Sequence, residues 1–177
     1  ADRLHTDLSR FDLPNRDEWW STYLHHEWRK GRAVDRLVRW AWEDNDKAVF
    51  DDEVIRLAAV TLAWFFTTAN RFLRDRATHA FVRLCENRLA VLRQILKQFR
   101  LVDDPYVTER LLAAAYGCAL RTTDQQGLAH LAMDVFRWVF ESGSPPPHIL
   151  IRDYARRIIE TALCRCPSFT VDASLIE

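Results

Sequence analysis

The residue pairs that could bind a metal ion or act as nucleophiles are few in this sequence. His25 and His26 are adjacent, but on a helix their side chains would point about 100° apart, so they would rarely share one ion. Cys164 and Cys166 have a single residue between them, which is a weak spacing for a metal or redox site. The other histidines have no histidine or cysteine partner at tight ligand spacing. We therefore expect no metal site in this chain.

Motifs for nucleotide binding and hydrolysis are also missing from the sequence. It contains no glycine-rich loop followed by Lys-Ser/Thr, no Gly-x-Ser-x-Gly and no His-Glu-x-x-His. The acidic residues at 51–53 open a predicted helix, where the helix dipole favours negative charge, so they need no catalytic explanation. We expect no enzymatic activity, no catalytic residue and no cofactor-binding residue in this segment.

The charge balance of the 177 residues is even, with 25 basic and 25 acidic side chains. A chain without net charge has no global field to attract nucleic acid or an anionic membrane. All of the basic residues except Lys30, Lys47 and Lys97 are arginines. Because arginine forms bidentate pairs with carboxylates and stacks on aromatic rings, this bias suits interhelix ion pairs or a protein-recognition surface. An arginine-rich genome composition would explain it equally well.

The cysteines and the ends of the chain bear on its location. Cys85 and Cys118 lie within apolar helical stripes, where a free thiol behaves as a small hydrophobic residue, so we expect a reducing, cytoplasmic environment. The sequence has no secretory leader pattern and no uncharged apolar run of about 18 residues, so we expect neither export nor a membrane span. The first residue is Ala1 and the only methionine is Met133. We expect the chain to be a piece of a longer protein.

Apolar periodicity predicts helix along almost the whole chain. Glycine and proline are scarce, four and six residues, and they fall mainly between the periodic segments. The pattern predicts eight helices, near residues 16–29, 33–44, 52–67, 71–86, 88–100, 105–121, 127–141 and 148–164. We expect one α-helical repeat domain over 1–177, with helix pairs near 16–44, 52–86, 88–121 and 127–164.

The predicted pairs have features of a helical repeat. Asp104 and Pro105 open one helix, as a capping side chain and a first-turn proline do, and alanines and a glycine follow. This opening resembles the second helix of a HEAT repeat. Leu73, Val107 and Ile151 occupy equivalent positions at spacings of 34 and 44 residues, within the range of about 34 to 47 residues of such arrays. The sequence predicts an all-α fold, a HEAT/TPR-like α-solenoid of about four helix pairs; an ordinary helical bundle is the alternative.

An Arg-Asp pair recurs in this pattern, as Arg74-Asp75 and again as Arg152-Asp153. In one interpretation the acidic residue pairs with an arginine of the next helix, which gives a ladder of ion pairs along the layer. In the other, the arginines of these helices form a concave binding surface. The residues of that surface would be Arg71, Arg74, Arg152 and Arg156.

Tryptophan is frequent, with seven residues, and two of them are adjacent in the first predicted helix. Trp19 and Tyr23 share one side of this helix, while Trp20 lies on a neighbouring side. Either one tryptophan is core and a preceding segment covers the other, or an exposed tryptophan near Arg16 is a protein-binding hot spot. We therefore include Arg16 and Trp20 with the four arginines as candidate protein-binding residues.

Four phrases of the sequence carry a resemblance to a known family: "RDEWWSTYL", "TTANRFLRDRATHAFVRL", "DDPYVTERLLAAAYGCALR" and "SPPPHILIRDYARRIIETAL". Together they resemble the C-terminal helical-repeat region of the STAND-type antiviral NTPases of the Avs (AVAST) family of bacteria and archaea. The resemblance implies a parent protein with an effector domain, an ATPase that uses ATP and Mg, and a repeat array that detects the large terminase subunit or the portal protein of a phage. Detection would trigger oligomerisation and switch on the effector.

This resemblance implies that the chain is part of the sensor array, with a phage protein and adjacent domains of the parent chain as its partners. The chain is far shorter than a full array and has no Walker motif, so no family catalytic or ATP-binding residue is carried over to it. Two alternatives stay open. The chain could be a structural repeat segment without direct ligand contact, or a helical array that binds nucleic acid through Arg71, Arg74, Arg83, Arg88 and Arg93. We also expect self-association through faces near Trp19 or Leu163.

Overall fold

The computed structural model describes residues 1–43 and 47–176, and the regular structure in these ranges is helical throughout. This confirms the all-α prediction. Three short 3₁₀ helices, at Lys47–Val49, Phe65–Thr67 and Ala173–Leu175, accompany nine α-helices. The α-helices are α1 (Asp2–Leu8), α2 (Leu13–Glu27), α3 (Ala33–Trp42), α4 (Asp52–Trp64), α5 (Arg71–Cys85), α6 (Leu89–Phe99), α7 (Pro105–Arg121), α8 (Gln125–Val139) and α9 (Ile149–Arg165).

The helices α2 to α9 coincide with the eight predicted ones to within a few residues, but α1 was not predicted. The start of α2 lies earlier than expected because the Asp12 side chain accepts a hydrogen bond from the backbone N–H of Asn15, and Pro14 fits the first turn. Residue 44, the predicted end of the second helix, lies outside the described residues.

The predicted Asp-Pro start of α7 is confirmed. The Asp104 carboxylate accepts hydrogen bonds from the backbone N–H groups of Tyr106, at 2.9 Å, and Val107, at 3.1 Å. Pro105, at the first helical position, has no N–H to satisfy. The side chains of Asp51, Asn70 and Asp124 cap the starts of α4, α5 and α8 in the same way.

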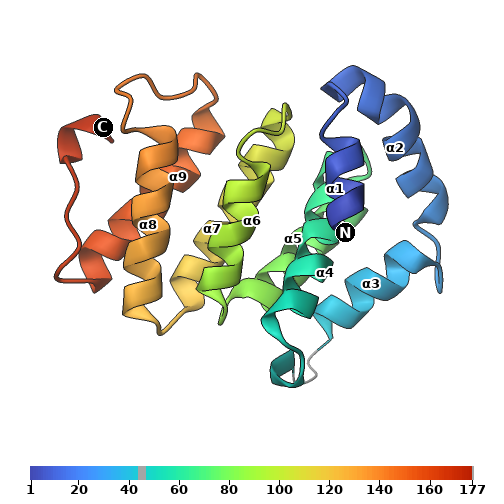
Figure 1. Cartoon of the computed structure of the whole chain (residues 1–177), viewed down its shortest axis with the longest axis horizontal. Coiled ribbons are helices and arrows are strands. Elements are labelled where there is room, and N and C mark those ends of the chain that lie inside the picture. The colour runs from blue at the N-terminus through green and yellow to red at the C-terminus, as the bar shows by residue number, and fades with distance from the viewer. Residues whose placement is uncertain (44–46, 177) are drawn as a thin grey trace.

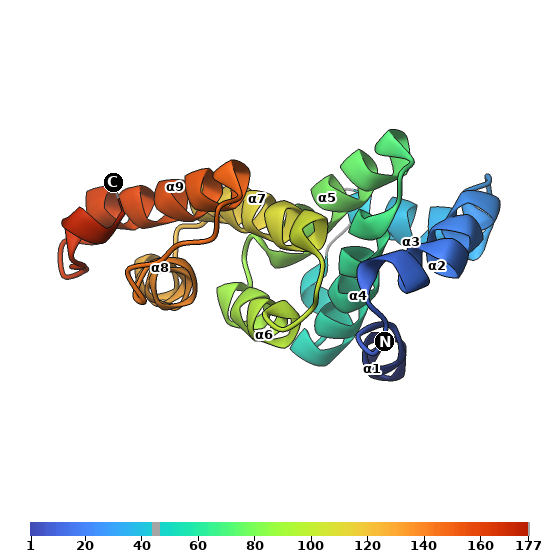
Figure 2. The same cartoon turned by 90° about the horizontal axis from the view of Figure 1, so that it is seen from above.

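The helices form two layers, which are seen edge-on in Figure 2. One layer contains α1, α4, α6 and α8, and its members contact one another in that order. The other contains α3, α5, α7 and α9, which also pack side by side in order. Consecutive helices from α4 to α9 therefore alternate between the layers. Figure 1 shows α2 at the opposite end of the molecule from α8 and α9.

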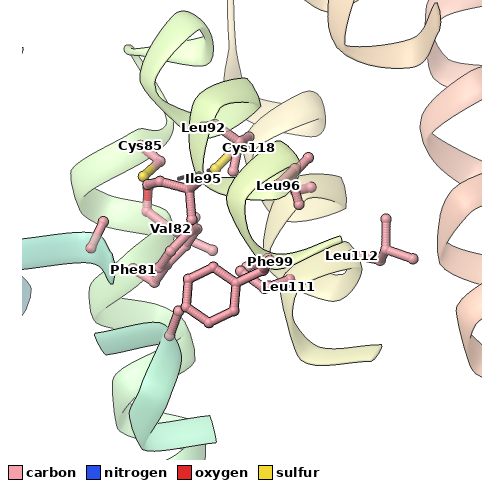
Figure 3. Close-up of a cluster of buried hydrophobic side chains, with 14 of the residues drawn as sticks. Phe81, Val82, Cys85, Leu92, Ile95, Leu96, Phe99, Leu111, Leu112 and Cys118 are labelled. Atoms are coloured by element: carbon pink, nitrogen blue, oxygen red, sulfur yellow. Dashed lines mark hydrogen bonds between the residues drawn. The ribbon is translucent and has the colours of Figure 1, made fainter. Parts of the chain in front are cut away.

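The core lies between the layers, and Figure 3 shows the part where α5, α6 and α7 meet. Side chains such as Phe81, Leu92, Ile95 and Leu111 have no exposed surface there. The small residues of α7 allow the close approach that the sequence predicts: a Cβ atom on Gly117 would lie 3.2 Å from Cγ2 of Val82. A side chain at position 117 would therefore require Val82 to shift by a few tenths of an ångström.

Ion pairs join neighbouring helices of the same layer. Arg110 of α7 contacts Asp75 of α5 at 3.2 Å, which is the ladder step that the sequence predicts between successive second helices. The next step differs: Glu109 of α7 faces the His148 imidazole at 3.6 Å, while Asp153 of α9 pairs with an arginine of its own helix. The ladder interpretation is therefore confirmed between α5 and α7 and wrong for Asp153.

The N-terminal helix α1 is attached to α4 by Arg56. The Arg56 guanidinium donates hydrogen bonds to both carboxylate oxygens of Asp2, at 2.8 and 2.7 Å. It also donates to the Glu53 carboxylate in α4. These hydrogen bonds lower the pKa of Asp2 and of Glu53 below their ordinary values of 3.8 and 4.5. The ionised forms of both carboxyl groups are thus favoured by the folded arrangement.

Acidification should release α1 before the remaining helices unfold. Because the folded chain lowers the pKa of Asp2, the stabilisation is complete above pH 3.8 and is lost as the pH falls below that value. Protection of the α1 amides from hydrogen exchange should fall in this range. In R56Q, the part of this loss that falls below pH 3.8 should vanish and α1 should be less protected at neutral pH. Protonation of His5, whose pKa is lowered by burial, should still weaken α1 on acidification below pH 6.5 in both proteins. An unchanged acid step in R56Q would contradict this role of Arg56.

No helix among the described residues is both long enough and apolar enough to cross a membrane.

Candidate functional site

A hollow of about 440 Å³ lies between α1, α2, α3 and the end of α4. We call it the aromatic groove. Its walls are almost entirely aromatic and aliphatic, which distinguishes it from the more polar hollows elsewhere on the described surface. The lining residues are Leu4, Trp19, Trp20, Tyr23, Ala33, Val34, Leu37, Thr61 and Phe65.

Three aromatic side chains of α2 form one wall of the groove in a fixed arrangement. The indole N–H of Trp20 donates a hydrogen bond to the carbonyl oxygen of Trp64 at 3.0 Å, which anchors α2 to the end of α4. Tyr23 stacks on Trp20 with ring centres 5.3 Å apart, and Trp19 meets Trp20 edge-on at 6.0 Å. Trp19 and Tyr23 are 43% and 46% exposed, so both present their rings to solvent from an ordered support.

The exposed aromatic surface continues beyond the groove to Phe11, which is also partly exposed. Its ring contacts Trp19 edge-on with centres 5.8 Å apart. Tryptophan and tyrosine expose large rigid surfaces and have few rotatable bonds to order, so a partner gains contact area at a small entropic cost. The groove is therefore suited to binding apolar side chains.

The structure corrects the two predicted binding residues of α2. Arg16 is completely buried, and its guanidinium contacts the Asp104 carboxylate at 2.6 Å. Trp20 is only 5% exposed because its indole packs under Tyr23 and binds the Trp64 carbonyl. Neither residue presents the exposed surface that the hot-spot interpretation requires. The exposed tryptophan of this helix is Trp19.

Two of the four predicted binding arginines have matching structural contacts. Arg74 donates to the carbonyl oxygen of Thr68 at 3.2 Å, and Arg152 donates to that of Pro146 at 2.9 Å. In both cases the acceptor lies six residues earlier, in the loop that leads into the helix. The recurring Arg-Asp pair thus has a local explanation, because its arginine fixes the loop before α5 and before α9.

The other two predicted arginines are more exposed and pair along their own helices. Arg71 contacts Asp75 at 3.4 Å, and Arg156 contacts Glu160 at 2.7 Å. The structure does not bring Arg71 and Arg156 into the aromatic groove, whose lining includes no arginine. The four arginines therefore do not add to this site.

Within residues 1–43 and 47–176, no group of three or more His, Cys, Asp or Glu side chains is placed to hold a metal ion. Burial raises the pKa of the Cys85 and Cys118 thiols, which lie in the apolar cluster of Figure 3. The Cys118 thiol donates to the carbonyl oxygen of Val82. Both cysteines stay protonated and are poor nucleophiles.

No family model matches the chain. No curated protein and no solved structure matches it either. The aromatic groove and the helices that form it are therefore the structural features that bear on function.

Proposed function

We propose that this chain is a protein-recognition segment and that its aromatic groove binds apolar side chains of a protein partner. The observation that carries the proposal is the half-exposed pair Trp19 and Tyr23, held in place by the anchored indole of Trp20. Apolar surface of this kind is costly to leave in water, and aromatic anchors of this kind dominate the affinity of many protein interfaces.

We infer further that α4–α5, α6–α7 and α8–α9 are successive pairs of a HEAT/TPR-like α-solenoid. The alternation of these helices between two layers supports this inference, as do the Asp-Pro start of α7 and the ion pair between Asp75 and Arg110. Such arrays expose extended surfaces that commonly bind proteins.

Within this proposal, the partner suggested by the family resemblance is a phage protein, the large terminase subunit or the portal. The chain would then belong to the sensor array of an antiviral STAND ATPase of the Avs type, with ATP and Mg bound elsewhere in the parent protein. Support comes from the phrase "RDEWWSTYL", because Trp19 and Tyr23 of the aromatic groove lie in it. The array would transmit binding to the ATPase and trigger oligomerisation.

Size-exclusion chromatography with light scattering, on the chain mixed with purified large terminase or portal protein, tests this function. We expect a co-eluting complex with one of them. The W19A/Y23A double variant should weaken it by about tenfold or more, since two aromatic anchors are removed. The matched control is F72A, which removes a 77% exposed ring of α5 outside the groove.

Two outcomes would contradict the proposal. A folded chain that binds neither phage protein would favour the alternative of a structural repeat segment without ligand contact. A complex that W19A/Y23A leaves intact would remove the aromatic groove from recognition. The same light-scattering measurement on the chain alone tests self-association near Trp19 or Leu163.

The nucleic-acid alternative receives no support from the arginines on which it was based. Arg83 pairs with Glu86, and Arg93 pairs with Asp134. Arg88 donates to backbone carbonyl oxygens of the segment before α4. Arg71 pairs with Asp75 and Arg74 donates to the carbonyl oxygen of Thr68, so each of the five arginines has a partner within the chain.

A further inference from the structure

A second groove, of about 300 Å³, lies between α6 and α8 in the same layer. We call it the basic groove. It differs from the aromatic groove because most of its rim is positively charged. The lining residues are Arg93, Leu96, Lys97, Arg100, Asp134, Val135, Arg137 and Trp138.

The charges in the basic groove do not cancel. Its one carboxylate, Asp134 of α8, accepts a hydrogen bond from the Arg93 guanidinium of α6 at 2.5 Å, so these two charges neutralise each other. Lys97, Arg100 and Arg137 are exposed, and no ion pair joins any of them to another residue of the described ranges. Three positive charges thus remain without counter-charges around one hollow.

The floor of the basic groove is apolar. Leu96 and Val135 lie at its base, almost fully buried between α6 and α8, and the half-buried Trp138 forms part of its side. An aliphatic or aromatic side chain of a ligand would bury surface mainly against Trp138, which is the most exposed part of this apolar lining. The cations around the floor would meanwhile remain partly hydrated and attract negative charge.

We propose that the basic groove binds an acidic segment of the protein partner. Two or three Asp or Glu carboxylates of that segment pair with Lys97, Arg100 and Arg137, and one apolar side chain packs on Leu96 and Trp138. This inference rests on the proposed protein-recognition function and adds the chemistry of the partner to it. A peptide fits better than a nucleic acid, because the apolar floor favours an aliphatic or aromatic side chain over a sugar-phosphate backbone.

Fluorescence anisotropy with a labelled synthetic peptide of alternating Glu and Leu tests the proposal on the whole chain. The same peptide with Gln in place of Glu is the ligand control. We expect the acidic peptide to bind more tightly than the Gln peptide. Charge reversal in K97E/R100E/R137E should weaken its binding by about tenfold or more, because three attractions become repulsions.

The matched control variant is R29E/K30E/R76E, which makes the same change in net charge at three other exposed basic residues. It should bind the acidic peptide like the wild type. Equal binding of the Gln peptide, or loss of binding in the control instead of in K97E/R100E/R137E, would overturn the proposal. Tighter binding of a single-stranded oligonucleotide, lost in K97E/R100E/R137E, would also overturn it and assign the groove to nucleic acid.

The outcome is separable from that of the proposed function. W19A/Y23A keeps the basic groove and should bind the acidic peptide normally. The chain could fail to bind the acidic peptide and still form a complex with a phage protein that requires Trp19 and Tyr23. That result would overturn the role of the basic groove and leave the proposed function in place.

Discussion

Replacement of Arg16 by methionine is expected to lower the free energy of unfolding by about 3–5 kcal/mol. The guanidinium of Arg16 and the carboxylate of Asp104 form an ion pair in which the two side chains are 0% and 2% exposed. Without Arg16, the Asp104 carboxylate would remain as an uncompensated charge in the core. Arg16 also donates hydrogen bonds to the carbonyl oxygens of Phe11 and Asp103, which join the start of α2 to the turn before α7. Chemical denaturation followed by the helical circular dichroism signal measures the loss.

The double variant R16M/D104N separates the effect of the unpaired charge from that of lost packing. Asparagine at position 104 retains an oxygen that can cap α7, and no charge is then buried, so most of the stability should return. The exposed Arg71 offers a matched control, because R71M should change the free energy of unfolding by at most about 0.5 kcal/mol. A loss below about 1 kcal/mol in R16M would contradict the structural role of the pair.

Replacement of Trp64 by alanine is expected to lower the free energy of unfolding by a similar amount, about 3–5 kcal/mol. Trp64 has no exposed surface and lies where α1, α2, α4 and α6 meet. The centre of its ring lies 5.5 Å from the ring centre of His5 in α1 and 5.1 Å from that of Phe99 in α6. The guanidinium carbon of Arg16 lies 5.3 Å from the same ring centre. Alanine would leave a cavity bordered by three helices. The same denaturation experiment measures the change.

The control for this variant is W19A, which removes the same side chain from an exposed position of the aromatic groove. Because nearly half of the Trp19 side chain already contacts solvent, W19A should cost much less than W64A. Equal losses in the two variants would contradict the larger contribution expected of the buried Trp64. The W19A result also shows whether W19A/Y23A can be used in binding experiments without loss of fold.

The helices were predictable because their signals are local. Apolar periodicity and the caps Asp51, Asn70, Asp104 and Asp124 act within one or two turns of the chain, so they are visible in the sequence. The helix α1 was missed because it is only seven residues long and is held by Arg56, 54 residues away. The role of Arg16 was missed for the same reason, because its partner Asp104 lies 88 residues away.

The candidate site was predicted only in part. The sequence places Trp19 and Tyr23 on one side of α2 and Trp20 on the next, and both sides are apolar, so the pattern does not tell which one is buried. The carbonyl oxygen of Trp64 decides this, and it lies 44 residues away from Trp20. Exposure of Trp19 and Tyr23 follows from that distant contact.

The same limit applies to the charged residues. An arginine in a sequence shows its charge but not its partner, and Arg74 and Arg152 proved to bind backbone carbonyl oxygens that no charge pattern reveals. Lys97, Arg100 and Arg137 have no ion-pair partner within residues 1–43 and 47–176, yet they occur in ordinary helical segments. Their common position around one groove is recognised only in the structure, where α6 and α8 lie side by side and Asp134 forms its ion pair with Arg93.

The order of helices within the two layers has a mechanical consequence. The main contacts of α9 are with α7 and α8, and those of α8 are with α6 and α9, so a force on the C-terminal helices reaches α4 through a series of interfaces. If these helix pairs form the α-solenoid proposed above, small rotations at successive interfaces would add up along the layers. Such rotations would change the distance between the aromatic groove at α2 and the basic groove between α6 and α8. A partner that binds both grooves at once would hold them at one fixed distance from each other.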